Sequence, residues 1–339
     1  MEGKGTVLVT GGSGFLGGWC IVSLLEAGYS VRTTVRDLAR ESEVRGGVAS
    51  ATEPGGRLEV VTADLMKDDG WAEAVAGCEY VLHVASPLPA TQPKDPDELI
   101  VPARDGTLRV LRASLEAGVK RVVMTSSVAA IRGTARRAEG PLTEDDWSNP
   151  NDSNLTPYAR SKTAAEQAAW ALVRERDATG RLAAVNPGAI IGPLLSDDPS
   201  YSLQAIDRML GGMPGVPKLG FSFVDVRDIA DLHRLAMTAP EASGERFIAV
   251  ERFLWMVEVG AVLRERLGER ARKVPTRTVP NFLVRGMSLF DGSLRSVVSD
   301  LGQKVTYSNE KAKTRLGWAP RPVEDSIADC AESMLARTA

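Results

Sequence analysis

Cysteine and histidine are scarce in this chain, which narrows the kinds of site that it can build. The sequence has 339 residues, of which three are cysteines and two are histidines. Cys20, Cys78 and Cys330 lie far apart and form no CxxC pair, so we expect no disulfide framework and a reducing compartment. With only His83 and His233 available, little remains from which to build a zinc site. We therefore expect no metal.

Signals for membranes, secretion and nucleic acids are also absent from the sequence. No apolar run reaches the ~18–20 residues that span a bilayer, and the first residues lack the charged and then apolar regions of a secretory signal. The net charge of −3 does not favour nucleic acid or a membrane surface as partner. We expect a cytoplasmic protein that acts on a small molecule.

Short β-like runs alternate with helix-length segments through the first half of the chain. The pattern predicts strands at 6–10, 29–35, 58–62, 80–84, 121–125 and 182–185, and helices at 15–27, 98–117 and 157–177. Strands that alternate with helices of this length indicate βαβ units and a parallel sheet. Most of these runs are apolar at nearly every position, which fits strands that are covered on both faces.

A glycine-rich loop follows the first expected strand and opens the first expected helix. Within residues 10–17, Gly12, Gly14 and Gly17 satisfy GxGxxG, and Gly11, Gly14 and Gly17 satisfy GxxGxxG. Glycines let the strand turn sharply and let the backbone approach a pyrophosphate, which the N–H groups at the helix start then bind. At a strand–helix junction inside a βαβ pattern, this loop predicts a dinucleotide site rather than an ordinary turn.

The predicted fold is therefore α/β, a Rossmann-type doubly wound parallel sheet with a smaller, mainly helical C-terminal substrate lobe. The pattern becomes irregular after 186–193, which we interpret as a loop rich in helix breakers. We expect helices at 202–210 and from 226 to about 238, a strand at 246–250 and a mostly helical tail beyond 252. The NADP-binding domain is expected to comprise 1–189 with 218–250 returning to it, and the lobe 190–217 and 251–339.

The end of the second strand indicates which nucleotide is bound. An NAD site places a carboxylate here for the ribose 2′-hydroxyl, whereas an NADP site places a cation near the 2′-phosphate. In this chain Val35 is apolar and Arg36 follows it, and Arg36 and Arg40 are able to form charge-assisted hydrogen bonds with phosphate. Asp37 is either an acid for NAD or the cap of the next helix. We expect NADPH.

Tyr158 and Lys162 form a YxxxK motif at the start of a predicted helix, where i,i+4 spacing places both on one face. A tyrosine can give a proton to the oxygen of a carbonyl that accepts hydride, but its ordinary pKa of about 10 makes it a slow acid–base near neutral pH. A nearby ammonium lowers that pKa. Ser127 ends the fifth strand, where it either holds the substrate oxygen or caps the next segment.

Together these segments resemble the extended short-chain dehydrogenases/reductases, in the dihydroflavonol reductase-like and aldehyde (ketone) reductase-like branch of the NAD-dependent epimerase/dehydratase superfamily. The resemblance runs from the first strand to about residue 250 and is weak in the tail. It is carried by the glycine loop and by Thr33–Asp37, Asp64–Leu65, His83–Pro87, Thr125–Ser127, Tyr158–Lys162, Ser161–Trp170 and Phe223–Ala230.

The resemblance implies an NADPH-dependent carbonyl reductase that converts an aldehyde or ketone to an alcohol, as a monomer or homodimer. Its catalytic residues would be Ser127, Tyr158 and Lys162, with Tyr158 as the proton donor. The residues implied along the cofactor are Gly11, Gly14, Phe15, Leu16 and Gly17 at the pyrophosphate, Arg36 at the 2′-phosphate, Asp64 and Leu65 at the adenine, Val84, Ala85 and Ser86 along the dinucleotide, and Lys162, Pro187 and Gly188 at the nicotinamide end.

Two other functions stay open, an NAD-dependent nucleotide-sugar epimerase or dehydratase and a non-catalytic NADP-sensing protein. Val35 stands where sugar-nucleotide epimerases carry an acid, and a mere sensor has no need of Ser127, Tyr158 and Lys162. Arg132 and the acidic segment 141–154 depart from plant flavonoid enzymes, so we expect a general ketone or aldehyde substrate. We interpret His83 as structural, His233 as a surface or lobe contact, and Asp225 to Asp228 as a polar turn able to dock the lobe.

Overall fold

The computed structural model describes residues 4–87, 95–133, 140–196, 201–288 and 298–338. Its centre is a seven-stranded sheet in which all neighbouring strands run parallel. In spatial order the strands are β10 (Arg246–Ala249), β6 (Leu182–Pro187), β5 (Arg121–Thr125), β4 (Cys78–His83), β1 (Lys4–Thr10), β2 (Tyr29–Val35) and β3 (Leu58–Thr62). The order reverses between β1 and β4, which is the switch point where Rossmann sheets bind ligands.

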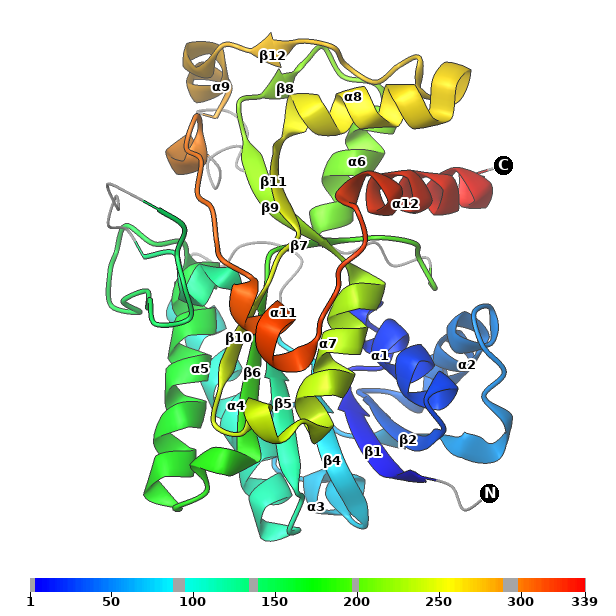
Figure 1. The fold of residues 1–339 in the computed structure, drawn as a ribbon, viewed down its shortest axis with the longest axis vertical. Coiled ribbons are helices and arrows are strands. Elements are labelled where there is room, and N and C mark those ends of the chain that lie inside the picture. The colour runs from blue at the N-terminus through cyan, green and yellow to red at the C-terminus, as the bar shows by residue number, and fades with distance from the viewer. Residues whose placement is uncertain (1–3, 88–94, 134–139, 197–200, 289–297, 339) are drawn as a thin grey trace.

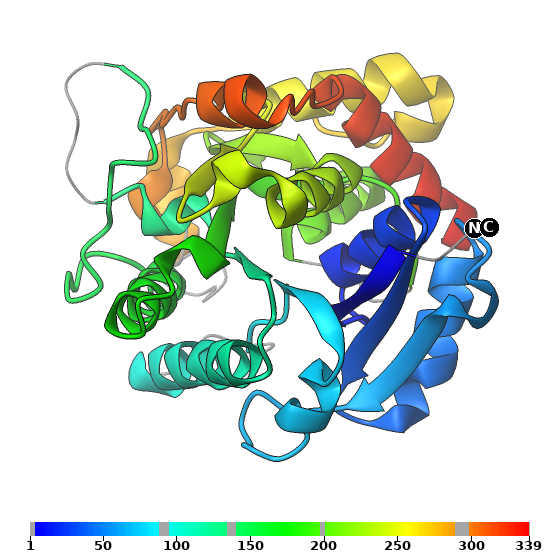
Figure 2. The ribbon, with the colours of Figure 1, turned by 60° about the horizontal axis from the view of Figure 1, so that its bottom comes forward.

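Helices cover both faces of this sheet (Figures 1 and 2). One face carries α1 (Phe15–Glu26), α2 (Glu41–Ala49) and α7 (Val226–Thr238), and the other carries α3 (Trp71–Val75), α4 (Asp97–Glu116) and α5 (Pro157–Glu175). Successive residues of a strand point to opposite faces, so Val7 and Val9 enter the core under α1 and α7, whereas Leu8 enters the core under α4 and α5. The predicted doubly wound fold is confirmed.

Local capping explains where α5 begins and ends. The side chain of Thr156 accepts a hydrogen bond from the backbone N–H of Ala159, at 3.2 Å, and Pro157 occupies the first helical position, where its missing N–H costs nothing. The helix ends at Glu175, two residues before the predicted end. Asp177 has φ of +51°, in the left-handed region, and an α-helix does not continue through such a residue.

A second part of the molecule lies beyond the carboxyl ends of the strands, in the upper half of Figure 1. It has a three-stranded sheet of β7 (Ala189–Ile191), β9 (Gly220–Asp225) and β11 (Arg252–Trp255), and a short pair of β8 (Val216–Pro217) and β12 (Thr278–Val279). Its helices are α6 (Tyr201–Gly211), α8 (Met256–Leu267), α9 (Asn281–Met287) and α12 (Val323–Thr338). These elements enclose a separate hydrophobic core.

Two features of this region differ from the sequence-based expectation. The segment 186–193 is not simply a loop, because Ala189–Ile191 forms β7 and pairs with β9. The tail also returns to the large sheet: α11 (Glu310–Leu316) and the ring of Trp318 pack into the core beside α7. None of the helices in the described ranges combines the length and apolarity that crossing a bilayer requires.

Candidate active site

The glycine loop is folded so tightly that side chains would not fit within it. Gly11 has φ of +76°, and its carbonyl oxygen accepts a hydrogen bond from the N–H of Gly14 at 3.0 Å. A Cβ on Gly17 would lie 2.2 Å from that same oxygen. Phe15 and Leu16 open α1, and no side chain of the N-cap residue Gly14 covers the first N–H groups. These donors and the bare backbone fit a pyrophosphate.

The ends of β1 and β4 are joined by the hydroxyl of Thr10. Its oxygen accepts hydrogen bonds from the N–H groups of Val84 and Ala85, both at 3.0 Å, so its proton is donated to Nδ1 of His83, also at 3.0 Å. Burial lowers the pKa of His83 to about 3, assisted by the charge of Lys162. His83 is therefore neutral and structural, as expected, and it fixes the segment from Val84 to Ser86 beside the glycine loop.

The predicted 2′-phosphate residues differ in their surroundings. Arg36 is exposed at the end of β2, and no ion pair of its side chain is found within the described ranges. Arg40 instead forms two hydrogen bonds to Glu43, each at 2.9 Å. Asp37 accepts a hydrogen bond from the N–H of Ala39 at 2.9 Å and caps the short 3₁₀ helix Leu38–Arg40. Of the two roles considered for Asp37, the structure shows the cap.

The residues predicted to flank the adenine, Asp64 and Leu65, lie just after β3. The carboxylate of Asp64 accepts a hydrogen bond from the N–H of Met66 at 3.0 Å, which turns the chain. The side chain of Leu65 lies against Gly106 of α4, at a distance where a Cβ on that glycine would be only 2.9 Å away. Because all strands of the sheet are parallel, the ends of β1, β2, β3 and β4 share one edge, and their predicted cofactor residues lie along it.

Ser127, Tyr158 and Lys162 come together at the carboxyl end of β5. The side chain of Tyr158 is hydrogen-bonded to Ser127. Lys162 is 9% exposed, and its ammonium donates to the carbonyl oxygen of Thr125 at 3.4 Å. The hydroxyl oxygen of Ser127 also accepts from the N–H of Ala129 at 3.1 Å, so this serine both caps the next segment and faces the tyrosine.

The charge states of these groups depend on burial. Burial raises the pKa of Tyr158, and its hydrogen bond with Ser127 lowers it. Burial lowers the pKa of Lys162 to about 8, and the carboxylate of Glu166 raises it. The hydrogen bond from Ser127 thus acts in the direction that the sequence analysis expected of Lys162. A lysine with this pKa is mainly charged at neutral pH and loses its charge above pH 8.

The far side of the site is formed by residues after β6. Pro187 is the last residue of β6, and Gly188 follows it into β7. A Cβ on Gly188 would lie 2.0 Å from the carbonyl oxygen of Ser222 on β9, so only glycine fits here. Both predicted residues therefore stand where the chain leaves the large sheet for the second part of the molecule.

The sequence analysis misjudged one histidine, His233, and missed one carboxylate, Glu166. His233 was expected as a surface or lobe contact, but it is completely buried because α7 packs its inner face on the large sheet. It accepts a hydrogen bond from the hydroxyl of Thr125 at 2.7 Å and donates to the carbonyl oxygen of Ile229 at 2.8 Å. Glu166 is also fully buried, and its only sequence signal is its position one helical turn after Lys162.

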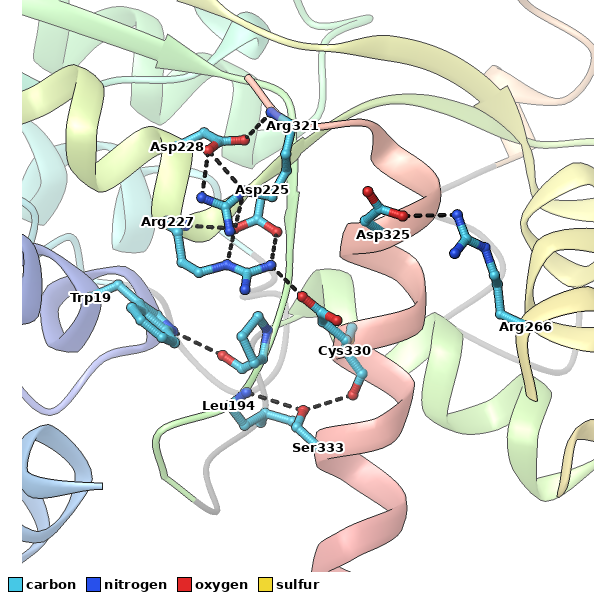
Figure 3. Close-up of polar contacts among 12 residues, drawn as sticks. Trp19, Leu194, Asp225, Arg227, Asp228, Arg266, Arg321, Asp325, Cys330 and Ser333 are labelled. Carbon is cyan, nitrogen blue, oxygen red and sulfur yellow. Dashed lines mark hydrogen bonds and ion pairs between the residues drawn. The ribbon is translucent and has the colours of Figure 1, made fainter. Parts of the chain in front are cut away.

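A cluster of acids and arginines joins the second part of the molecule to α7 (Figure 3). Asp225 accepts from the backbone N–H and the guanidinium of Arg227, which also pairs with Asp329 on α12 at 2.6 Å. Asp228 accepts two hydrogen bonds from Arg321, at 2.8 and 2.9 Å. The polar turn therefore contacts the C-terminal segment, as the lobe-docking interpretation anticipated.

Comparisons with known proteins agree with this geometry. The model of the NAD dependent epimerase/dehydratase family matches residues 7–249. Cinnamoyl-CoA reductase CAD2 of Medicago truncatula is 38% identical over 268 residues, covering 76% of this chain and 80% of that protein. Dihydroflavonol 4-reductase of Zea mays is 34% identical over 277 residues, covering 78% and 75%. The yeast methylglyoxal/isovaleraldehyde reductase Gre2, solved with NADPH, superimposes with a TM-score of 0.83 at 24% identity, over 98% and 99% of the two chains.

Proposed function

The chain belongs to the NAD dependent epimerase/dehydratase family and is an oxidoreductase of its reductase branch, and we propose that it reduces an aldehyde or ketone to the alcohol with NADPH. The observation that carries this proposal is the meeting of Ser127, Tyr158 and Lys162 at the end of β5. This end lies on the same sheet edge as the glycine loop. The family alone does not decide the reaction, since one fold serves many functions.

NADPH would supply the hydride to the carbonyl carbon. The glycine loop and the uncapped start of α1 would hold the pyrophosphate, and Arg36 would contact the 2′-phosphate because its guanidinium has no ion pair within the described ranges. Arg40, already paired with Glu43, would contribute less. Val35 offers no carboxylate to a ribose 2′-hydroxyl, which supports NADPH over NADH.

In the proposed mechanism the hydroxyls of Ser127 and Tyr158 donate hydrogen bonds to the carbonyl oxygen, where negative charge develops as its carbon gains hydride. Tyr158 then transfers its proton to that oxygen, which completes the alcohol and leaves a tyrosinate. The ammonium of Lys162 stabilises this tyrosinate until the proton is replaced from solvent. Since the pKa of Lys162 is about 8, reduction should slow as the pH rises above that value.

The test of this mechanism is Tyr158→Phe, which keeps the ring and removes the proton. We expect turnover to fall by about 10²–10⁴-fold, as for other general acids, with the Kd for NADPH nearly unchanged. Tyr80→Phe is the matched control, because Tyr80 lies on β4, away from the carboxyl edge of the sheet, beside Lys120. A Tyr158→Phe enzyme with more than about a tenth of the wild-type rate would contradict the assignment of a general acid.

We also propose that residues 1–189 with 218–250 bind the cofactor, whereas 190–217 and 251–339 form the lobe that receives the substrate. The two cores of the molecule support a division into two parts, because one lies around the large sheet and the other around β9, β11 and α8. They shift two of the proposed boundaries: β9, within 218–250, belongs to the second core, and α11, within 251–339, packs on the large sheet. The cytoplasmic location and the monomeric or homodimeric state stay predictions.

A further inference from the structure

A buried ion pair lies beside the catalytic serine and lysine, and no step of the proposed chemistry uses it. Glu166 on α5 is completely buried, and Arg246 on β10 is 7% exposed. Nε of Arg246 lies 2.6 Å from Oε1 of Glu166. A buried ion pair is weak grounds for stability, because the cost of removing both charges from water offsets their attraction. The contacts of the pair indicate a second role.

Both oxygens of the Glu166 carboxylate accept hydrogen bonds. Oε1 and Oε2 together accept hydrogen bonds from four side chains, namely Arg246 at 2.6 Å, Trp170 at 3.3 Å, Ser126 at 2.5 Å and Asn186 at 2.9 Å. All four groups act as donors here, so the carboxyl group is ionised. The donors come from β10, α5, the end of β5 and the end of β6, and one carboxylate therefore joins four elements.

Asn186 extends this network to the backbone of the catalytic serine. Its Nδ2 donates both to Glu166 and, at 3.2 Å, to the carbonyl oxygen of Ser127. Its Oδ1 is buried with no partner in the described part of the chain, an arrangement that costs free energy. The amide is turned toward Glu166 and Ser127 despite that cost, so these contacts determine its orientation and fix Ser127 from behind.

The same carboxylate faces the ammonium of Lys162, one turn earlier on α5. The other titratable groups around Lys162 in the described ranges are Tyr158 on α5 and His83 on β4, and His83 is neutral because its pKa is about 3. The guanidinium of Arg246 is engaged elsewhere as well, by the carbonyl oxygen of Glu144 at 2.6 Å and by the ring of Trp147 at 3.6 Å. Glu166 thus supplies the negative charge next to the lysine.

We propose that Glu166, held by Arg246, is a positioning residue for the proton transfer: it fixes the backbone of Ser127 and provides the charge that faces Lys162. The proposal rests on the proposed carbonyl reductase function. It predicts that loss of this charge affects proton transfer more than cofactor binding, because Glu166 lies beneath β5 and β6 rather than beside the glycine loop.

The experiment is the pH profile of kcat for carbonyl reduction at saturating NADPH, with thermal unfolding measured alongside. Without the carboxylate, the alkaline limb set by Lys162 should move down by about 1–3 pH units, the usual effect of one nearby opposite charge. We therefore expect Glu166→Gln to lose at least about fivefold in kcat at pH 8, where the wild-type lysine is half charged, while its Kd for NADPH stays near that of the wild type. Glu175→Gln, an exposed residue at the end of the same helix, is the matched control and should leave the profile unchanged.

A second variant covers the case in which Glu166→Gln unfolds because it leaves Arg246 charged and buried. Glu166→Gln with Arg246→Gln removes both charges together. We expect this pair to regain stability but to keep the lowered alkaline limb, whereas a purely structural ion pair would restore the whole profile. A folded variant with the wild-type alkaline limb overturns the positioning role. If none of the carbonyls supports oxidation of NADPH by the wild-type protein, the proposed function is overturned instead, so the two failures are distinct.

Discussion

Gly17 is the position where adding one methyl group should have the largest effect on the nucleotide site. A Cβ there would lie 2.2 Å from the carbonyl oxygen of Gly11, whereas ordinary contact begins at 3.4 Å, so the two segments would have to separate by about 1.2 Å. Neither side moves freely. Cys20 and Ile21 anchor α1 in the core, and Gly11 is held by the hydroxyl of Thr34 at 3.1 Å.

Overpacking of this kind costs about 1–3 kcal/mol. In the free protein the loop is able to deform and so relieve part of the strain. Pyrophosphate binding needs the undeformed loop, so binding must restore the strained conformation and becomes weaker by about that energy. We expect Gly17→Ala to weaken NADPH binding by about 10–100-fold, since about 1.4 kcal/mol corresponds to a factor of ten. We also expect it to lower the Tm.

Fluorescence titration with NADPH and thermal unfolding measure the two effects. Gly46→Ala on α2 is the matched control: a Cβ there meets nothing within 4 Å, and replacing a helical glycine should stabilise by about 0.5–1 kcal/mol. Wild-type affinity and wild-type Tm in Gly17→Ala would refute the argument from close backbone approach.

Three further predictions concern cofactor choice, lobe docking and acid stability. Arg36→Leu should raise the KM for NADPH at least tenfold and leave that for NADH unchanged; steady-state kinetics with both cofactors test this, and an equal loss for both would contradict it. Asp228→Asn should lower the Tm by more than Asp325→Asn does, because Asp228 is only 4% exposed. The ion pair of Asp325 with Arg266 is about half-exposed, and such surface pairs contribute about 0–1 kcal/mol to stability. Equal shifts of the Tm in differential scanning calorimetry would contradict the docking role of Asp228. Burial lowers the pKa values of His83 and His233 from 6.5 to about 3 and about 4, so between pH 6.5 and pH 4 the unfolded state binds more protons than the folded state. The free energy of unfolding should therefore be highest above pH 6.5 and should fall toward pH 4 by up to about 1.4 kcal/mol per pH unit for each histidine. Urea unfolding with a constant free energy over this pH range would contradict the prediction.

Elements with strong local signals could be predicted from the sequence. The bounds of β2 and β5 agree with the expected strands, and α1 and α5 begin at the predicted Phe15 and Pro157. Glycines, a proline and short apolar runs are enough to mark these positions. The helix α2 was not predicted, because Gly46 and Gly47 interrupt its apolar pattern. Val44 and Val48, on either side of these glycines, are nevertheless buried in the core.

Features that depend on distant partners could not be predicted. β7 forms only because β9 lies beside it, about thirty residues later. Ser127, Tyr158 and Lys162 could be named because the YxxxK motif and the serine at a strand end together carry the resemblance to a known family. Glu166 and Arg246, 80 residues apart, carry no common pattern, and only the meeting of α5 with β10 brings them together.

The most direct test of the account is carbonyl-dependent oxidation of NADPH by the purified protein, with NADH in parallel. The panel should contain aryl ketones, small aldehydes, 2-oxo esters, a dihydroflavonol and a hydroxycinnamoyl thioester. We expect oxidation of NADPH with at least one carbonyl, faster than with NADH. No oxidation with either cofactor across the panel would contradict it and would favour a nucleotide-sugar epimerase or dehydratase with tightly held NAD, or a non-catalytic sensor of NADP.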